Sequence, residues 1–174
     1  MHKHSFPPCA RPACRLLILG SLPGDESLRQ VQYYAHPRNA FWWIMGRWCG
    51  FEPLLPYEER VERLNAAGIA LWDVVASGRR KGSLDQHIED EIPNDIPGLL
   101  RECPSIRTIA CNGTAAHRYL KKYFPALWSM PGLDILLLPS TSPAAARLTR
   151  EEKEVLWRAA LAEGLPGFRN AGSA

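Results

Sequence analysis

The sequence has no apolar run that approaches the roughly 20 residues a helix needs to cross a bilayer. The segment 1–15 contains basic side chains but no apolar core, so it does not have the form of a secretory signal. The five cysteines are an odd number, and their close pairs are spaced C-x4-C and C-x7-C, with no C-x2-C. We therefore expect reduced thiols in a cytoplasmic protein, with no metal or iron–sulfur cluster.

Signatures of several common enzyme classes are also missing. The glycine turn Gly20–Gly24, GSLPG, has no phosphate-binding lysine and does not have the spacing of a dinucleotide fingerprint. No Gly-x-Ser-x-Gly elbow is present, and the five histidines are scattered. The sequence thus indicates neither ATP nor NAD chemistry nor a catalytic triad, and we expect no cofactor. The net charge of +3 permits an acidic partner without demanding one.

The sequence does contain an alternation of strand and helix patterns. Continuous apolar segments predict strands over 16–21, 69–75, 105–112 and 134–139. Helical patterns lie over 41–49, 57–67, 84–91 after a Ser83 cap, 95–102, 114–124 and 150–164 after a Thr149 capping box. This alternation predicts an α/β fold, a three-layer α/β/α sandwich with a central four-stranded parallel sheet, in a single domain 1–174. We expect residues 1–14 and 166–174 to be loose termini.

Glycines and small polar residues follow each of the four predicted strands. These segments are Gly20–Gly24, Asp73–Gly78, Asn112–Gly113 and Ser140–Ala146. Because the carboxyl ends of parallel strands meet at one edge of a sheet, the pattern predicts a ligand site there. The segment Ala76–Ser83, which contains Arg79-Arg80-Lys81, is a predicted basic loop close to the same edge, and we expect Arg79 and Arg80 to contact phosphate.

Asn39 is the polar residue of most interest, since it separates a His-Pro-Arg loop from an aromatic helix start. An amide can position a water molecule but cannot serve as a strong base, so hydrolysis that relies on it needs a leaving group that departs easily. The same side chain can instead cap the helix 41–49. The residues alone leave both interpretations open and favour the cap, just as Asn112 can simply form an Asn-Gly turn.

Four pieces of sequence, in order, carry a resemblance to a known family. They are GSLPG from Gly20, QYYAHPRNAFW from Gln32, CNG from Cys111 and LPSTSPAAAR from Leu138. Together they resemble the uracil-DNA glycosylase superfamily, and within it the hypoxanthine-DNA (deoxyinosine) glycosylase branch, over about three quarters of the chain. The resemblance implies a monofunctional DNA glycosylase of base excision repair. It would hydrolyse the N-glycosidic bond of deoxyinosine in damaged DNA and release hypoxanthine, and we expect it to act as a monomer.

The resemblance also assigns roles to individual residues. Asn39 is the implied catalytic residue, and Tyr34, Phe41 and Asn112 are the implied base-binding residues. Leu22 stands where most of the superfamily has Asp or Asn, and the usual histidine of the second motif is absent. The implied phosphate- or DNA-binding residues are Ser21, Gly24, Ser27, Ser140, Thr141, Ser142, Pro143 and Arg147.

Two alternatives stay open beside this interpretation. One is a mismatch-specific uracil-DNA glycosylase, against which Leu22 argues because uracil excision in relatives relies on a polar residue there. The other is a DNA-lesion-binding domain without catalysis, which would use the same aromatic and basic residues to bind nucleic acid.

Overall fold

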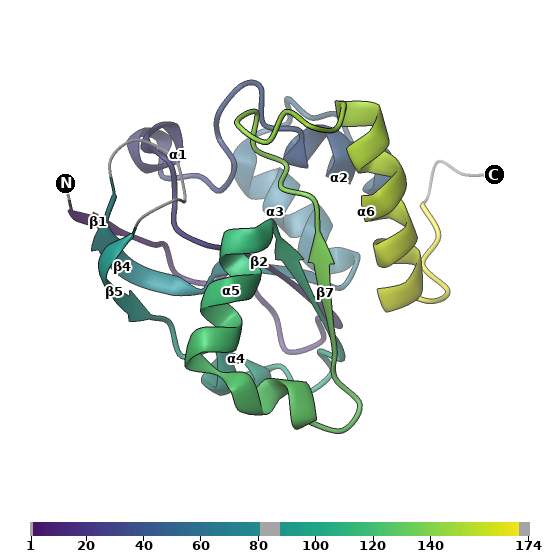
Figure 1. The fold of residues 1–174 in the computed structure, drawn as a ribbon. Coiled ribbons are helices and arrows are strands. Elements are labelled where there is room, and N and C mark those ends of the chain that lie inside the picture. The colour runs from purple at the N-terminus through teal and green to yellow at the C-terminus, as the bar shows by residue number, and fades with distance from the viewer. Residues whose placement is uncertain (1, 81–87, 171–174) are drawn as a thin grey trace.

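The centre of the protein is a sheet of four parallel strands in the order β3-β2-β6-β7 (Figure 1). The structure is a computed structural model that describes residues 2–80 and 88–170. The strands are β2 (Leu16–Gly20), β3 (Ile69–Asp73), β6 (Thr108–Asn112) and β7 (Asp134–Leu138). Strands β2 and β6 are buried along their whole length, as expected for a parallel sheet covered on both faces. The predicted four-stranded parallel sheet is confirmed.

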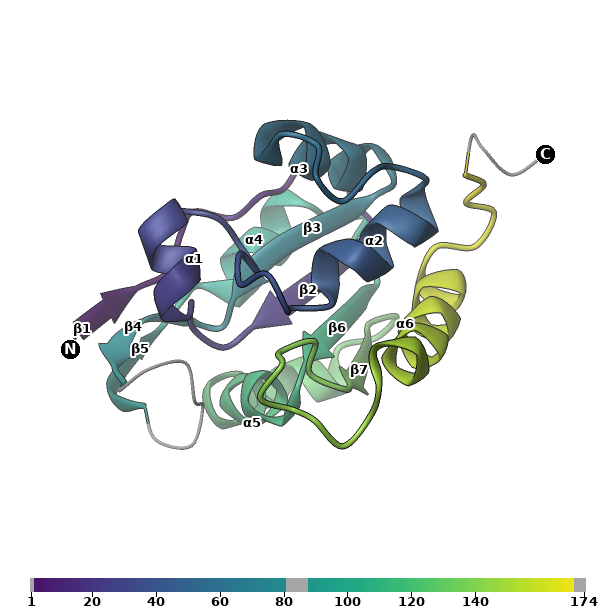
Figure 2. The same cartoon turned by 90° about the horizontal axis from the view of Figure 1, so that it is seen from above.

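Helices cover the sheet on both faces, and the side chains of β2 alternate between them. Leu16 and Ile18 pack beneath α2 (Phe41–Cys49), α3 (Tyr57–Ala66) and α6 (Arg150–Gly164). Leu17 and Leu19 pack on the other side, beneath α4 (Ile96–Glu102) and α5 (Thr114–Tyr123). Figure 2 looks down on this arrangement, with α2 and α3 on one side of the sheet and α5 on the other. The predicted three-layer α/β/α arrangement is therefore confirmed.

Short polar contacts fix where the helices begin. The Thr149 hydroxyl oxygen accepts a hydrogen bond from the Glu152 N–H at 3.1 Å, and Glu152 reaches back to Thr149, which completes the predicted capping box of α6. Asp95 caps α4 through its side chain, which accepts a hydrogen bond from the Gly98 N–H at 3.0 Å.

The shorter helices are α1 (Asp25–Gln30) and the 3-10 segment η1 (Pro125–Ser129). None of the helices in the described ranges is long and apolar enough to cross a membrane.

A second, antiparallel sheet was not predicted. It has the order β1-β4-β5, formed by β1 (His2–His4), β4 (Val75–Arg79) and β5 (Glu89–Pro93). The predicted basic loop is therefore wrong over β4, and the helix expected over 84–91 is wrong over Glu89–Glu91. Ser83 and the rest of 81–87 lie outside the described residues. The serine and glycine of β4 suggest a turn by composition, but pairing with strands on both sides overrides that local preference.

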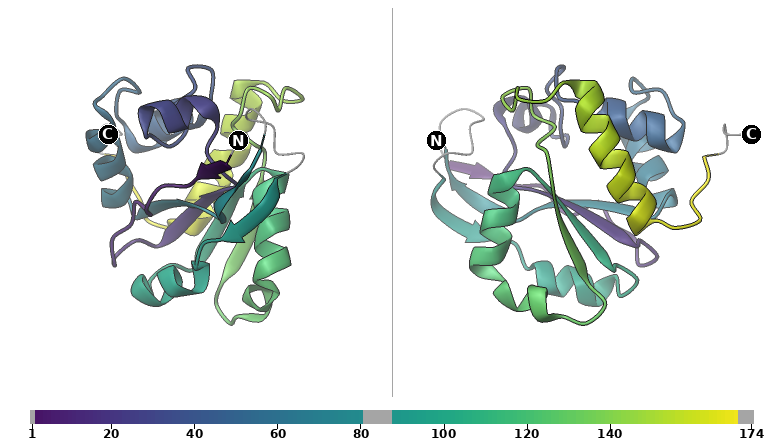
Figure 3. Two further views of the ribbon diagram at one scale, coloured as in Figure 1. Left: turned by 90° about the vertical axis from the view of Figure 1, so that its left-hand side faces the viewer. Right: turned by 45° about the vertical axis from the view of Figure 1, so that its right-hand side comes forward.

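The expectation of a loose amino-terminal segment is also wrong. Strand β1 pairs with β4 (Figure 3, left). The backbone of Cys9 forms an antiparallel β-bridge with Leu71 of β3, at the edge of the main sheet. Lys3 is buried, and its Nζ lies 2.8 Å from the Asp25 carboxylate at the start of α1. This segment is held because its backbone continues the sheets, a feature that composition does not reveal.

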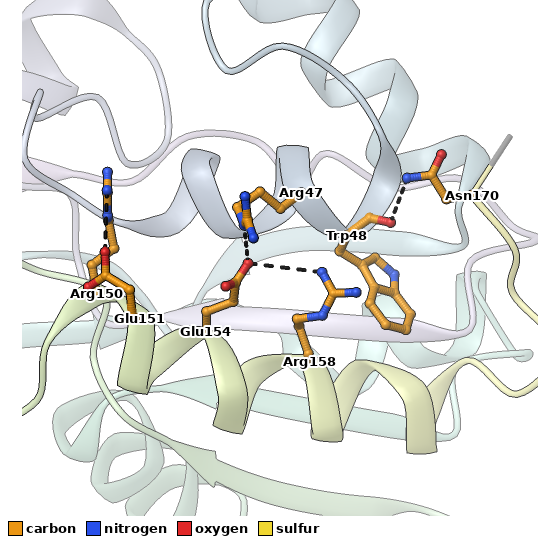
Figure 4. Close-up of polar contacts among 7 residues, drawn as sticks. All are labelled: Arg47, Trp48, Arg150, Glu151, Glu154, Arg158 and Asn170. Atoms are coloured by element: carbon orange, nitrogen blue, oxygen red, sulfur yellow. Dashed lines mark hydrogen bonds and ion pairs between the residues drawn. The ribbon is translucent and has the colours of Figure 1, made fainter. Parts of the chain in front are cut away.

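The carboxyl-terminal segment packs as well, at least as far as Asn170. The ring of Phe168 stacks on Trp48 at 5.5 Å between centroids. Figure 4 shows the other contact, in which Asn170 Nδ2 donates to the Trp48 carbonyl oxygen at 3.4 Å. The same view shows Glu154 of α6 between Arg47 of α2 and Arg158. The loose terminus expected from 166 onward is therefore wrong for 166–170, and 171–174 lie outside the described residues.

Candidate active site

A cavity of about 370 Å³ lies at the carboxyl edge of the parallel sheet. This volume is within the range of small-molecule sites. In Figure 1 the segment between α1 and α2 lies beside the loop after β7 at the top of the molecule, above the ends of the strands. Most of the predicted site residues line the cavity: Ser21, Gly24, Ser27, Tyr34, Asn39, Asn112, Ser140, Thr141, Ser142 and Pro143. The four strand ends thus form one site, as the alternation of strands and helices predicts.

Asn39 lines the cavity and also contacts the start of α2. Its Oδ1 accepts a hydrogen bond from the Phe41 N–H at 2.9 Å, as a helix-capping side chain does. The two interpretations of Asn39 are therefore compatible, because one side chain lines the cavity while its oxygen is oriented by the helix. Oδ1 keeps a second lone pair, and Nδ2 carries two protons.

Asn112 is bound on both sides of its amide by Thr141. Nδ2 donates to Thr141 Oγ1 at 2.9 Å, and Oδ1 accepts from the Thr141 N–H at 2.9 Å. The Thr141 carbonyl oxygen in turn accepts from the Ala40 N–H at 3.0 Å. These contacts connect the end of β6, the loop after β7 and the start of α2, so the cavity walls contributed by three distant segments are held in one arrangement.

Tyr34 faces the cavity and is supported from behind by Phe41, whose ring centroid is 4.1 Å away. The Tyr34 backbone has a φ of 56°, a left-handed conformation that a residue other than glycine adopts only when its surroundings impose it. Phe41 itself is fully buried among Trp42 and Trp157 and does not line the cavity. The predicted direct contact of Phe41 with a base is therefore not met, and its place is beneath Tyr34.

Asp73 is the important site residue that we did not predict individually. It ends β3 and is only 3% exposed, yet it lines the cavity, and its Oδ2 accepts a hydrogen bond from Ser5 Oγ at 2.9 Å. A Cβ on Gly20 would lie 2.5 Å from Asp73 Oδ1 and 3.1 Å from Tyr34 Oη. The absence of a side chain at Gly20 therefore lets the Asp73 carboxylate and the Tyr34 hydroxyl both lie close to the backbone at the end of β2. The position of Asp73 at a strand end was the available signal.

The arginines at the end of β4 make contacts within the protein. Arg80 is buried, and its Nη2 donates to the carbonyl oxygens of Leu22 and Pro23 at 3.0 and 2.8 Å, which holds the glycine turn in place. Arg79 pairs with Glu89 and Asp90 of β5 at 3.5 and 2.6 Å. Lys81 lies outside the described residues. The expectation that Arg79 and Arg80 contact phosphate is therefore replaced by structural roles.

The loop from Ser140 to Ala144 turns its hydroxyls toward the cavity side. Ser140 Oγ accepts from the Ser142 N–H at 3.2 Å, and Ser142 Oγ accepts from the Ala144 N–H at 3.2 Å. Each hydroxyl oxygen is thereby used as an acceptor, and its proton stays available for donation to a bound group. Arg147 is exposed on the same loop, outside the cavity lining.

The remaining polar groups of the site play smaller parts. Ser27 Oγ accepts from the Ala35 N–H at 3.1 Å, and His36 Nδ1 accepts from the Arg38 N–H at 3.1 Å, so both shape the loop that carries Tyr34 and Asn39. Within the described ranges, no three His, Cys, Asp or Glu side chains gather as metal ligands. The five cysteines are free, and burial raises the pKa of Cys111 to about 12.

A parallel α/β sandwich with a cavity at the carboxyl edge of its sheet, lined by Asn, Asp and Tyr, is the arrangement of an α/β enzyme that binds a small polar ligand. The model of the Uracil DNA glycosylase superfamily matches residues 7–162, and the chain belongs to this superfamily.

Two relatives from Methanosarcina species are named hypoxanthine DNA glycosylase. The one from Methanosarcina acetivorans is 41% identical over 161 residues, which cover 91% of this chain and 98% of the relative. The one from Methanosarcina barkeri is 38% identical over 154 residues, 88% of this chain and 94% of the relative. A solution NMR structure of a Methanosarcina acetivorans protein, described as a candidate uracil DNA glycosylase, has a TM-score of 0.80. It is 39% identical and covers 94% of this chain and 98% of that one.

Proposed function

We propose that the protein is a monofunctional DNA glycosylase that hydrolyses the N-glycosidic bond of deoxyinosine and releases hypoxanthine. The observation that carries the proposal is the meeting of Asn39, Tyr34 and Asp73 in one base-sized cavity. Two relatives that match nearly the whole chain bear the name of this activity. A base inside a duplex cannot reach such a cavity, so the nucleotide must be flipped out of the stack.

Asp73 provides the means to distinguish hypoxanthine from adenine. Hypoxanthine carries a proton on N1, whereas adenine has an unprotonated N1 acceptor beside an amino group. A buried carboxylate accepts from the N1–H of hypoxanthine and repels the N1 lone pair of adenine. Asp73 lines the cavity, and the hydrogen bond from Ser5 Oγ to Oδ2 helps to hold the carboxylate in place. Normal adenine, present in large excess, is thereby rejected.

Tyr34 supports stacking of the flipped base. Its ring lines the cavity and lies over Phe41, so a base that stacks on it completes a stack of three rings. Base–aromatic stacking contributes about 1–3 kcal/mol. The contact with Phe41 helps to hold the Tyr34 ring before the substrate arrives, which reduces the conformational entropy lost on binding.

Asn39 positions the attacking water. Its Oδ1 is oriented by the Phe41 N–H and keeps one lone pair for a proton of that water. Because an amide is not a strong base, the reaction proceeds by departure of the base and development of positive charge on the sugar, which nearby oxygen atoms stabilise. Leu22 lines the cavity at the position where most of the superfamily has a polar residue, and it excludes solvent there.

No lysine is among the described residues that line the cavity, so we expect no Schiff base with the sugar and an intact abasic strand as the product. The Ser140–Ser142 hydroxyls and Arg147 hold the flanking phosphates. All of these groups come from one chain, which supports action as a monomer. The five free thiols support work in the reducing cytoplasm, alongside the cell's DNA.

The test is a substrate panel under single-turnover conditions. Duplexes that contain deoxyinosine, deoxyuridine or only normal bases are incubated with excess enzyme, and released bases are separated chromatographically. We expect hypoxanthine from deoxyinosine and no release of adenine, with strand cleavage only after alkali. Uracil presents a similar N–H and carbonyl edge, so faster release of uracil than of hypoxanthine would contradict the proposed substrate. Binding without any release would support the lesion-binding alternative.

A further inference from the structure

A lysine lies buried directly behind the loop that we assign to phosphate binding. Lys153 is in the second turn of α6, is only 5% exposed, and its Nζ donates to the Ser142 carbonyl oxygen at 3.2 Å. One turn later, Trp157 Nε1 donates to the Pro139 carbonyl oxygen at 2.9 Å. Two side chains on the inner face of α6 therefore hold the loop after β7, Trp157 at Pro139 and Lys153 at Ser142. The lysine is at the end of the loop that lines the cavity.

The charge of Lys153 has no carboxylate partner among the residues that the structure describes, although its neighbours in sequence are acidic. Glu151 pairs with Arg150, and Glu154 lies between Arg47 and Arg158 (Figure 4). Glu152 is used in the capping box with Thr149. The usual reason for a lysine beside three glutamates, a solvated ion pair on a helix surface, therefore does not apply.

A buried, uncompensated cation is unfavourable in the unbound protein. Its burial lowers the pKa of Lys153, since desolvation penalises the charged form. Such a charge is retained where something negative arrives to offset it, and DNA phosphate is the anion that the adjacent loop is built to hold. The Ser142 carbonyl oxygen, turned inward to Nζ, is also kept from facing that phosphate.

We propose that Lys153 is a positioning residue that places a buried positive charge behind the Ser140–Ser142 loop and so strengthens binding of a DNA phosphate. This inference rests on the proposed function, because the phosphate belongs to the flipped nucleotide or its neighbour. Lys153 does not line the cavity, and its effect is transmitted through the Ser142 peptide and through the electrostatic field.

The test compares Lys153→Met and Lys153→Gln with the wild type. Methionine removes the charge and the donor at similar length, whereas glutamine keeps a donor for the Ser142 carbonyl without the charge. Lys121→Met, an exposed lysine on α5, is the matched control. Affinity is measured by fluorescence anisotropy for a duplex with a tetrahydrofuran abasic-site analogue, which the enzyme cannot cleave, at several salt concentrations. Thermal unfolding is measured on the same samples.

We expect both Lys153 variants to bind this duplex about tenfold more weakly than the wild type, with a shallower dependence of log Kd on log salt. Their unfolding temperature should be equal or higher, because an uncompensated buried ion is removed. The single-turnover rate at saturating enzyme should change much less than the affinity. Wild-type affinity in either variant overturns the inference while leaving the proposed function intact. Failure of the wild type itself to bind the duplex overturns both.

Discussion

Both atoms of the Asn112 amide are bonded to one residue, Thr141, through contacts of 2.9 Å to its side chain and its backbone. Two residues that are distant in sequence are thus joined at the edge where β6 and β7 end. This geometry makes Asn112 first of all the residue that fixes the loop after β7. Any contact with a base uses the proton and lone pair that Thr141 leaves free.

Asn112→Ala should therefore destabilise the protein even without substrate. The buried Thr141 N–H loses its acceptor, and a buried unsatisfied donor costs about 1–3 kcal/mol. Urea unfolding measures the loss, and hydrogen exchange at the Thr141 amide shows whether it is local to this loop. Asn94→Ala, which removes another side-chain bond to backbone near the site, is a suitable comparison. Unchanged protection of Thr141 would contradict the assigned role.

Asp73→Asn should reduce the discrimination between hypoxanthine and adenine. The amide can present either a donor or an acceptor to N1, and one hydrogen bond to a charged group contributes about 1.5–3 kcal/mol. We expect hypoxanthine release to slow by about 10- to 150-fold in single-turnover assays. Asp134→Asn, at the exposed start of β7, controls for the change of charge. Equal loss in both variants would indicate a general electrostatic effect instead of base recognition.

Tyr34 and Phe41 should respond in opposite ways to truncation, although the sequence assigns them the same role. Phe41→Ala removes a fully buried ring and should lower the free energy of unfolding by about 3–5 kcal/mol. Tyr34→Ala removes a partly buried ring that lines the cavity and should weaken binding of the flipped base by about 1–3 kcal/mol with a smaller effect on stability. Chemical unfolding and single-turnover titrations separate the two. A loss of stability with Tyr34→Ala as large as that with Phe41→Ala would contradict this assignment.

The fold could be predicted because its strands are continuous apolar runs bounded by turn residues. The Thr149–Glu152 capping box could be predicted because it depends on neighbours along the chain. Strands β1 and β5 escaped prediction because their stability comes from pairing with β4, and polar composition hides such pairing. A strand that is stabilised by partners far along the chain leaves only a weak local signal.

The site was predictable in location but less so in detail. The strand end placed Asn112 at the cavity, and the family resemblance placed Asn39 there. The helical spacing of Phe41 with Ile44 and Met45 agrees with its burial, whereas the resemblance assigned it to the base. The buried charges of Asp73 and Lys153 were missed because burial of a charged residue depends on tertiary packing. The predicted conflict between a capping and a cavity role for Asn39 disappears, since one amide has enough hydrogen-bonding capacity to do both.

Stability should fall in alkaline solution above about pH 9. Burial raises the pKa of Cys49 and Cys111 to about 12, and it raises the pKa of Tyr57 as well. The folded state therefore keeps protons that the unfolded state releases, so the free energy of unfolding decreases from the unfolded thiol pKa of 9.0 up to about 12. Lys153 acts in the opposite direction, since its pKa is lowered.

Urea unfolding from pH 7 to 11 measures this effect. The variant Cys111→Ala should show a weaker decline than the wild type, because it removes one of the raised groups. The native thiols of Cys49 and Cys111 should also react slowly with thiol reagents, since burial suppresses the thiolate. Rapid modification of both thiols without loss of structure would contradict the burial on which this prediction depends.

The most direct test of the account is single-turnover release of hypoxanthine by two variants of Asn39, measured beside thermal unfolding. Asn39→Ala loses the amide and the contact with the Phe41 N–H, whereas Asn39→Ser keeps a capping oxygen but is too short to position a water. The account predicts that Asn39→Ser melts close to the wild type yet releases hypoxanthine about 100- to 1000-fold more slowly, as expected for loss of a transition-state contact. A wild-type rate in Asn39→Ser, with slow release or early melting only in Asn39→Ala, would show that Asn39 serves as a cap, and the proposed mechanism would be wrong.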